Sequence, residues 1–143
     1  MVKVKIKKIE GCTDAIIPSY AHHGDAGLDL YSRTTVSLLP GERASVGTGI
    51  CIELPEGFVG LVWDKSGLSH THGLKTVGGV IDATYRGEVM VGIMNLSQGP
   101  YCIEKGHKIA QLLIQKIENA DIEIIDDLSD TSRGESGFGS SGK

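Results

Sequence analysis

The sequence predicts an all-β protein, a distorted antiparallel jelly-roll or β-sandwich with one short helix and a flexible C-terminal arm. Three observations support this fold class. Short runs of alternating apolar and polar residues recur along the chain, glycine and proline turns separate them, and no stretch keeps an apolar period of 3.6 residues. Regularly spaced strands joined by tight turns are typical of antiparallel sandwiches and barrels.

The predicted strands begin near the N-terminus. Residues 2–7 alternate valine or isoleucine with lysine, which predicts an edge strand with a basic, solvated face. Residues 44–54 alternate most cleanly, and residues 58–63 follow them after a Pro-Glu-Gly turn. Residues 109–115 predict a strand that is apolar on both faces, and the isoleucines of residues 122–125 predict a last short strand.

Composition divides the chain and limits its function. Residues 1–128 carry the strand pattern of one β-sandwich domain, whereas residues 129–143 are a glycine-rich arm. The arm's arginine, phenylalanine and paired hydroxyls suit a lid over an anionic aromatic ligand, with a disordered tail as the alternative. The net charge of −4 argues against general nucleic-acid binding. Without a membrane-spanning run, a secretory signal or metal-binding cysteine spacing, we expect a soluble intracellular protein.

The chemistry is expected in residues 78–88, Gly-Gly-Val-Ile-Asp-Ala-Thr-Tyr-Arg-Gly-Glu. An apolar alternation at residues 89–93 follows, so the pattern predicts a β-hairpin with Asp82 at its tip. Beside apolar Val80 and Ile81, the Asp82 carboxylate would lie at the edge of a desolvated pocket, where it can act as a base and hold a water. Alternatively, Asp82 only opens a turn, because aspartate bonds its own backbone well there.

Two other stretches and one glutamine carry candidate binding groups. Asp29 lies between two leucines, where an acid needs a partner, and it is either a buried structural acceptor or part of a metal's water shell. Lys65, Ser66 and Gly67 follow a strand end and supply a cation, a hydroxyl and backbone N–H groups for phosphate, with a helix cap at Ser66 as the alternative. Gln111 interrupts an apolar run and must bond a neighbouring strand or reach the active site.

Five segments occur in the order of one family's motifs. They are residues 26–30 (Ala-Gly-Leu-Asp-Leu), 65–68 (Lys-Ser-Gly-Leu), 79–87 (Gly-Val-Ile-Asp-Ala-Thr-Tyr-Arg-Gly), 106–112 (Gly-His-Lys-Ile-Ala-Gln-Leu) and 133–142 (Arg-Gly-Glu-Ser-Gly-Phe-Gly-Ser-Ser-Gly). Their sequence and order closely resemble the motifs of the trimeric deoxyuridine triphosphatases. The resemblance covers nearly the whole chain, including the glycine-rich arm.

This resemblance implies a jelly-roll homotrimer with active sites at the subunit interfaces, each completed by an arm from another subunit. It implies magnesium-dependent hydrolysis of dUTP to dUMP and pyrophosphate, which keeps uracil out of DNA and supplies dUMP for thymidylate synthesis. Asp82 matches the carboxylate that activates water, and Asp29 matches the acid that holds metal-bound waters. The residues that match substrate contacts are Lys65, Ser66, Gly67, Gly79, Val80, Ile81, Tyr85, Met90, Gln111, Arg133, Phe138, Gly139, Ser140 and Ser141.

Three positions depart from the family's pattern. Lys65 stands where the family usually has arginine, so a bidentate fork becomes a point charge. His107 and Lys108 replace an acidic residue and an arginine, which calls into question a salt bridge that anchors the arm there. Thr76 stands where some members have an asparagine that contacts the base, so we expect base recognition through the backbone.

Two alternatives use the same scaffold. One is a dCTP deaminase, plain or bifunctional, but that branch prefers phenylalanine where Tyr85 stands. It also carries a catalytic glutamate where this chain has Gly-Ile-Met-Asn at residues 92–95. The other is a non-catalytic trimer that senses nucleotides, against which the intact Asp82 and arm argue.

Overall fold

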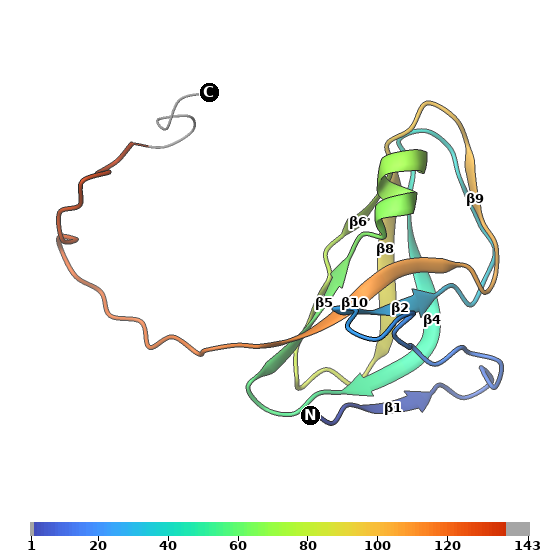
Figure 1. Ribbon diagram of the computed structural model, residues 1–143, viewed down its shortest axis with the longest axis horizontal. Coiled ribbons are helices and arrows are strands. Elements are labelled where there is room, and N and C mark those ends of the chain that lie inside the picture. Colours follow the sequence, from blue (N-terminus) through green and yellow to red (C-terminus); the bar gives the residue numbers. More distant parts are fainter. Residues whose placement is uncertain (1, 137–143) are drawn as a thin grey trace.

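The computed structural model describes residues 2–136, which contain ten strands and one short π-helix (Figure 1). The strands are β1 (Lys5–Lys8), β2 (Gly27–Tyr31), β3 (Val36–Leu38), β4 (Arg43–Glu53), β5 (Phe58–Trp63), β6 (Leu74–Val77), β7 (Val80–Ile81), β8 (Glu88–Asn95), β9 (Tyr101–Ile103) and β10 (Lys108–Lys116). The helix is η1 (Gly67–Thr71), and no helix in residues 2–136 is long and apolar enough to cross a membrane. The predicted all-β class with one short helix is confirmed.

The strands pair antiparallel in two four-stranded sheets and one two-stranded sheet. The first sheet has the order β1-β4-β8-β6, the second β2-β10-β5-β7, and the third consists of β3 and β9. In the second sheet β10 lies between β2 and β5, and its register sets Gln111 opposite both Asp29 and Trp63. Lys65 follows Trp63 closely. The predicted site residues Asp29, Lys65 and Gln111 therefore come together at the C-terminal end of β5.

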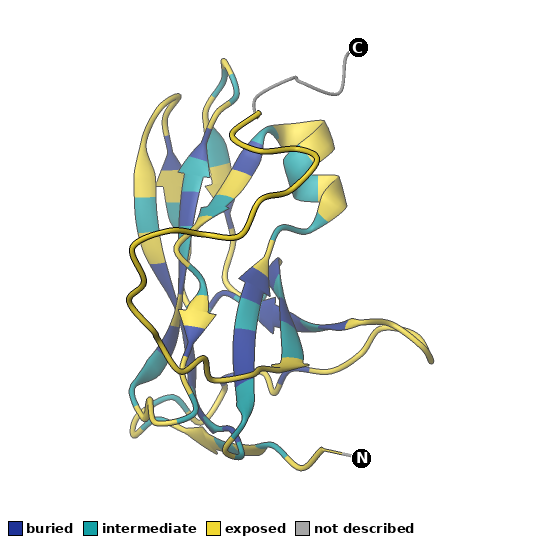
Figure 2. Cartoon of the chain, turned by 90° about the vertical axis from the view of Figure 1, so that its left-hand side faces the viewer, coloured by how far each residue is buried: buried dark blue, intermediate teal, exposed yellow. Residues whose placement is uncertain are grey.

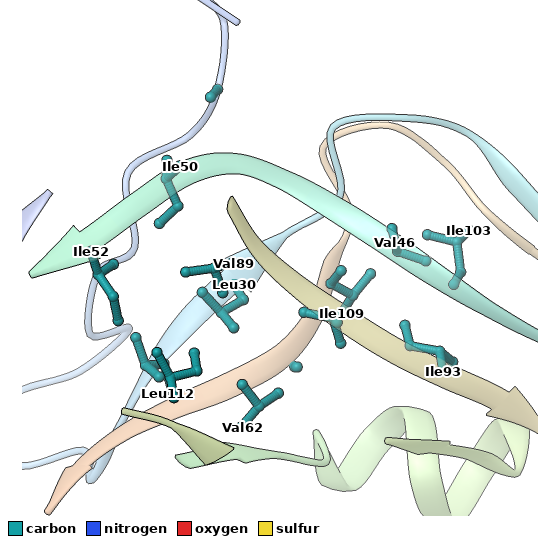
Figure 3. Close-up of a cluster of buried hydrophobic side chains, with 14 of the residues drawn as sticks. Leu30, Val46, Ile50, Ile52, Val62, Val89, Ile93, Ile103, Ile109 and Leu112 are labelled. Atoms are coloured by element: carbon teal, nitrogen blue, oxygen red, sulfur yellow. The ribbon is translucent and has the colours of Figure 1, made fainter. Parts of the chain in front are cut away.

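Side chains from both four-stranded sheets form one hydrophobic core (Figure 3), and the buried residues of the strands are marked along the chain in Figure 2. Leu30 of β2, Ile50 of β4 and Val91 of β8 are completely buried. On β10, consecutive residues Ile109 and Ala110 are both buried, which explains why this strand is apolar on both faces. The core thus fixes the strands that carry the site residues.

The predicted hairpin at residues 78–93 is wrong in its pairing. β7 pairs with β5 in the second sheet, whereas β8 pairs with β4 and β6 in the first. The hairpin is formed by β6 and β8, and the connection between them, residues 78–87, contains β7; we call this connection the Asp82 loop. Gly79 lets the chain change sheets, because its φ is 113° and a Cβ there would lie 2.8 Å from the Val62 carbonyl oxygen.

The predicted strand at residues 122–125 is absent from the structure. β10 ends at Lys116, and residues 117–136 leave the sandwich outside any strand or helix (Figure 1). Ile122 and Ile124 are 80% and 95% exposed in the single chain. The alternation there has the strand period, but a strand also needs a hydrogen-bonding partner, which period does not supply. Regular structure ends before the predicted domain boundary at residue 128.

Candidate active site

The Asp82 loop begins its turn at Asp82 itself. The Asp82 carbonyl accepts a hydrogen bond from the Tyr85 N–H at 3.0 Å, so a turn begins here, but it does so through the backbone and not through the side-chain bond that the turn alternative predicts. The Asp82 side chain is exposed in the single chain rather than at the edge of a desolvated pocket. Because the turn uses the backbone carbonyl, the carboxylate remains available for substrate.

Short-range contacts hold the Tyr85 ring. Its hydroxyl donates to the Glu88 carbonyl at 3.0 Å, and the ring packs directly on Gly87, where a Cβ would lie only 2.6 Å from Tyr85 Cζ. The Arg86 guanidinium donates to the carbonyls of Ala83 and Tyr85 at 2.6 and 2.8 Å. Gly87 is therefore required by the ring beside it, and the loop presents Tyr85 in a fixed orientation.

A cavity of about 180 Å³ lies against this loop. Its lining residues are Gly79, Val80, Ile81, Asp82, Tyr85, Glu88, Val89 and Met90. The Ile81 side chain is buried in the core, so any contact of Ile81 with a ligand falls to its backbone. Val80 and Met90 are 69% and 40% exposed in the single chain. The cavity is therefore lined both by the residues predicted to bind uracil and by Asp82, the predicted catalytic base.

Glu88 also lines this cavity, although nothing in the sequence predicts a role for it. Its Oε1 atom accepts the Gly49 N–H at 2.8 Å and lies 2.8 Å from Arg33 Nε. These contacts tie the end of the Asp82 loop to β4. A single acid at the end of a motif gives no sequence signal for such a structural role.

Asp29 lies at the centre of a compact charge cluster. Its residue is 3% exposed, its Oδ1 lies 2.5 Å from Lys65 Nζ, and its Oδ2 lies 2.7 Å from Lys108 Nζ. Burial raises the pKa of the Asp29 carboxyl, but the lysine ammonium groups, Lys108 and then Lys65, outweigh burial and hold it below its usual range. Asp29 is thus a buried acceptor, as one of its two predicted roles requires, and its partners are Lys65 and Lys108.

We define residues 64–67 as the Lys65 turn. Ser66 forms no side-chain hydrogen bond to the start of η1, so the helix-cap alternative is absent. A Cβ at Gly67 would meet nothing within 4 Å, so packing within the chain does not demand glycine there. Since no neighbour in the chain requires a glycine at this position, the missing side chain is consistent with close approach of a ligand to the backbone.

Gln111 holds the Lys65 turn from the neighbouring strand. Its Nε2 donates to the Asp64 carbonyl at 2.8 Å, and Gly27 leaves the space that the Gln111 side chain occupies. Thr76 also contacts this turn, because its hydroxyl and its N–H both donate to Asp64 Oδ1. Asp64 is the residue of this site that sequence reasoning missed, since its partners are distant in sequence.

A divalent cation fits this site only through water. No group of three or more His, Cys, Asp or Glu side chains in residues 2–136 could bind a metal directly. Asp29 Oδ2 is buried and lies near Lys108 Nζ in an ion pair without hydrogen-bond geometry, so its acceptor capacity is not fully used. Such an oxygen suits the water shell of Mg²⁺, which keeps several of its waters when it binds phosphates.

The two regions lie far apart in one chain. β7 pairs with β5 through Gly60 with Ile81 and Leu61 with Val80, so Asp82 faces the start of β5, whereas Lys65 follows its end. In this register Val59 lies opposite Asp82, and Lys65 follows six positions later, which is at most about 20 Å at ~3.3 Å per residue. Asp82 and Lys65 therefore lie toward opposite ends of β5 in one chain.

The described part of the arm lies outside both regions. Arg133 is exposed, and its Nε donates to the Ser136 carbonyl at 2.8 Å within the arm itself. The predicted contacts Phe138, Gly139, Ser140 and Ser141 lie outside the described residues.

Comparison with known proteins defines the class. A family model described as dUTPase matches residues 13–142, which include both the Asp82 loop and the Lys65 turn. The fold and the site together are those of a jelly-roll hydrolase of deoxynucleoside triphosphates.

Curated relatives give the particular family. Proteins named deoxyuridine 5'-triphosphate nucleotidohydrolase share 47% identity in Corynebacterium glutamicum, over 100% of this chain and 97% of the relative, and 46% in Clostridium kluyveri, over 99% of each. A dUTPase of Staphylococcus bacteriophage 80alpha, solved with dUpNHpp, superposes with a TM-score of 0.91 at 33% identity over 99% of each chain. The chain therefore belongs to the dUTPase family, and its activity is hydrolysis of dUTP to dUMP.

Proposed function

We propose that this dUTP diphosphatase works as a homotrimer in which the Asp82 loop of one subunit and the Lys65 turn of another form each active site. The observation that carries this proposal is the placement of Asp82 and Lys65 toward opposite ends of β5 in one chain, at most about 20 Å apart by the strand register. Catalytic groups must lie within hydrogen-bond reach of the substrate, about 3 Å. Two copies of the chain can meet this requirement on one triphosphate where the loop of one copy lies beside the turn of the other.

The Asp82 loop supplies the nucleoside side of the site. The cavity beside Gly79, Val80 and Met90 takes the uracil ring, and backbone groups read its edge. The fixed Tyr85 ring stacks on the deoxyribose and leaves no room for a 2′-hydroxyl. The exposed Asp82 carboxylate accepts a proton from a water molecule, whose oxygen forms a bond to the α-phosphorus. The bond from the α-phosphorus to the bridging oxygen breaks, and pyrophosphate leaves with that oxygen.

The Lys65 turn supplies the phosphate side. Lys65 Nζ, 2.5 Å from Asp29 in the single chain, turns toward the phosphates, and Lys108 remains as the counter-ion of Asp29. Ser66 and Gly67 add a hydroxyl and backbone N–H groups. Gln111 supports this side by holding the turn rather than by acting on the reaction. Since lysine is a point charge, the orientation of the phosphate depends on these neighbours.

Magnesium is the cofactor that this site suits. Asp29 would hold it through water, while the substrate phosphates bind it directly. The bound ion would neutralise charge that develops on the phosphates. A structure of a dUTPase from phage phi11 of S. aureus, with 28% identity and a TM-score of 0.82, describes coordination of a structural Mg(II) ion.

The C-terminal arm completes the site as a lid. Arg133 contacts phosphate, Phe138 stacks on uracil, and Gly139, Ser140 and Ser141 close over the terminal phosphates. The chain leaves the sandwich after Lys116, and residues 117–136, which include the described part of the arm, are exposed, so the arm is free to reach another subunit (Figure 2). Residues 129–143 are the part that we assign to the lid.

The test replaces Asp82 by asparagine and measures hydrolysis and binding separately. Loss of the base should lower kcat by about 10²- to 10⁴-fold. Binding of dUpNHpp, followed by calorimetry, should change little, because Asp82→Asn keeps the size of the side chain. Unchanged turnover would refute the role of Asp82. In the wild type, ammonia released from dCTP would support a deaminase, and dUTP binding without turnover would support a sensor.

A further inference from the structure

Asp64 is the first residue of the Lys65 turn, and it contacts two strands. Its Oδ1 accepts hydrogen bonds from the Thr76 N–H and hydroxyl, each at 2.7 Å, and its Oδ2 lies 2.7 Å from Lys75 Nζ. Its backbone carbonyl accepts the Gln111 amide at 2.8 Å. One residue is therefore bonded to both β6 and β10, and Lys65 is its direct successor in the chain.

These contacts join the two large sheets. Lys75 and Thr76 belong to the sheet that contains β6, whereas Gln111 belongs to the sheet that contains β10 and β5. Partial burial raises the pKa of the Asp64 carboxyl, but the bonds from Lys75 and Thr76 outweigh burial and hold the pKa below its usual range. Asp64 is thus ionised, and charge-assisted bonds of this kind are stronger than neutral ones.

The other side-chain restraints on the turn are weaker or conditional, and a backbone bond from the Ser69 N–H to the Lys65 carbonyl, at 2.9 Å, holds only its helical side. The Lys65 ammonium is paired with Asp29, a contact that it must loosen to reach a phosphate. Ser66 adds no capping bond to η1. Lys75 and Thr76 lie outside the phosphate-binding set, so Asp64 can keep its carboxylate contacts while Lys65 changes partner.

We propose that Asp64 is a positioning residue, which fixes the Lys65 turn in the geometry that receives the triphosphate. Asp64 acts through the turn and does not touch the substrate. This inference rests on the proposed phosphate-binding role of the Lys65 turn. Nucleoside recognition should depend less on Asp64, because the Asp82 loop is held by its own local contacts, the Tyr85 hydroxyl on the Glu88 carbonyl and the Arg86 guanidinium on the Ala83 carbonyl.

The test compares two ligands on the full-length protein with magnesium. In Asp64→Ala, calorimetry should show dUpNHpp binding weakened about tenfold, equivalent to ~1.4 kcal/mol. Binding of dUMP, which lacks the β- and γ-phosphates, should change by less than about twofold. A residue that only stabilises the fold would not separate the two ligands in this way.

Two variants serve as controls. Asp64→Asn keeps an oxygen that can accept the Thr76 bonds, so it should restore most of the dUpNHpp affinity. Glu53→Gln breaks the Lys5–Glu53 pair, also 2.7 Å long, which joins β1 to β4, and it should change neither ligand.

The outcomes separate this inference from the function on which it rests. Wild-type dUpNHpp affinity in Asp64→Ala, or an equal loss of dUMP affinity, would overturn the positioning role. If Lys65→Ala weakens dUpNHpp while Asp64→Ala does not, only this inference fails. If Lys65→Ala also binds dUpNHpp normally, the phosphate-binding role of the turn is wrong.

Discussion

The Asp82 loop and the Lys65 turn are held by different kinds of contact. In the Asp82 loop, Tyr85 bonds the carbonyls of Asp82 and Glu88, each three residues away. In the Lys65 turn, Lys65 pairs with Asp29 across 36 residues, and Asp64 bonds a glutamine 47 residues away. The loop takes its shape mainly from its own sequence, whereas the turn takes its shape from the completed fold. The two should therefore respond differently to mutation.

The largest effect on stability is expected at Asp29. Asp29→Asn removes the buried charge between two ammonium groups, so the free energy of unfolding should fall by roughly 2–3 kcal/mol, less than for a fully buried pair because the lysine side chains remain partly in water. Urea denaturation measures this change. A stability equal to that of the wild type would show that the charge cluster does not hold the turn to the fold.

A change in the Asp82 loop should lower activity without lowering stability. Gly87→Ala places a Cβ against the Tyr85 ring, and displacement of the ring should reduce kcat/KM for dUTP by about 10- to 100-fold. The free energy of unfolding should stay within about 0.5 kcal/mol, as for other surface changes. Because the ring excludes the 2′-hydroxyl, the ratio of dUTP to UTP hydrolysis should also fall. An intact ratio would place the discrimination elsewhere.

The smallest effect is a dependence of stability on pH. The pKa of Asp64 is lowered in the folded protein, so its ionised contacts stabilise the fold above the ordinary aspartate pKa, and this contribution disappears as pH falls through the lowered value. The wild type should lose its advantage over Asp64→Asn below about pH 4. Urea denaturation between neutral and acid pH measures it, and a constant difference would argue against an ionised Asp64.

The same contrast explains what the sequence could predict. Period-two alternation located β4 closely, and short apolar runs that follow turns located β5 and β10, because burial on the faces of a strand follows the order of residues. Alternation does not identify the pairing partner of a strand. For that reason the alternation predicts a hairpin of β7 with β8, although β7 pairs with β5, and it predicts a strand at residues 122–125 that the single chain does not form.

The site shows the same limit. The sequence of the Asp82 loop indicated a turn, a carboxylate and a ring, and the structure has them in one local unit. The importance of Asp64 depends on Thr76 and Gln111, which only the sheet register brings to it. An acid between two leucines is a usable signal at Asp29, whereas Asp64 follows the apolar strand β5 and has no such apolar neighbour after it.

Subunit complementation tests the central claim that each active site combines two chains. Asp82→Asn and Lys65→Ala should each be nearly inactive alone. When the two are unfolded, mixed in equal amounts and refolded, random assembly should restore about a quarter of the sites, because an intact loop and an intact turn then meet at an interface between subunits. Activity near a quarter of the wild type is the predicted result. A mixture as inactive as its components, with mixed oligomers shown by mass spectrometry, would contradict an active site shared between chains.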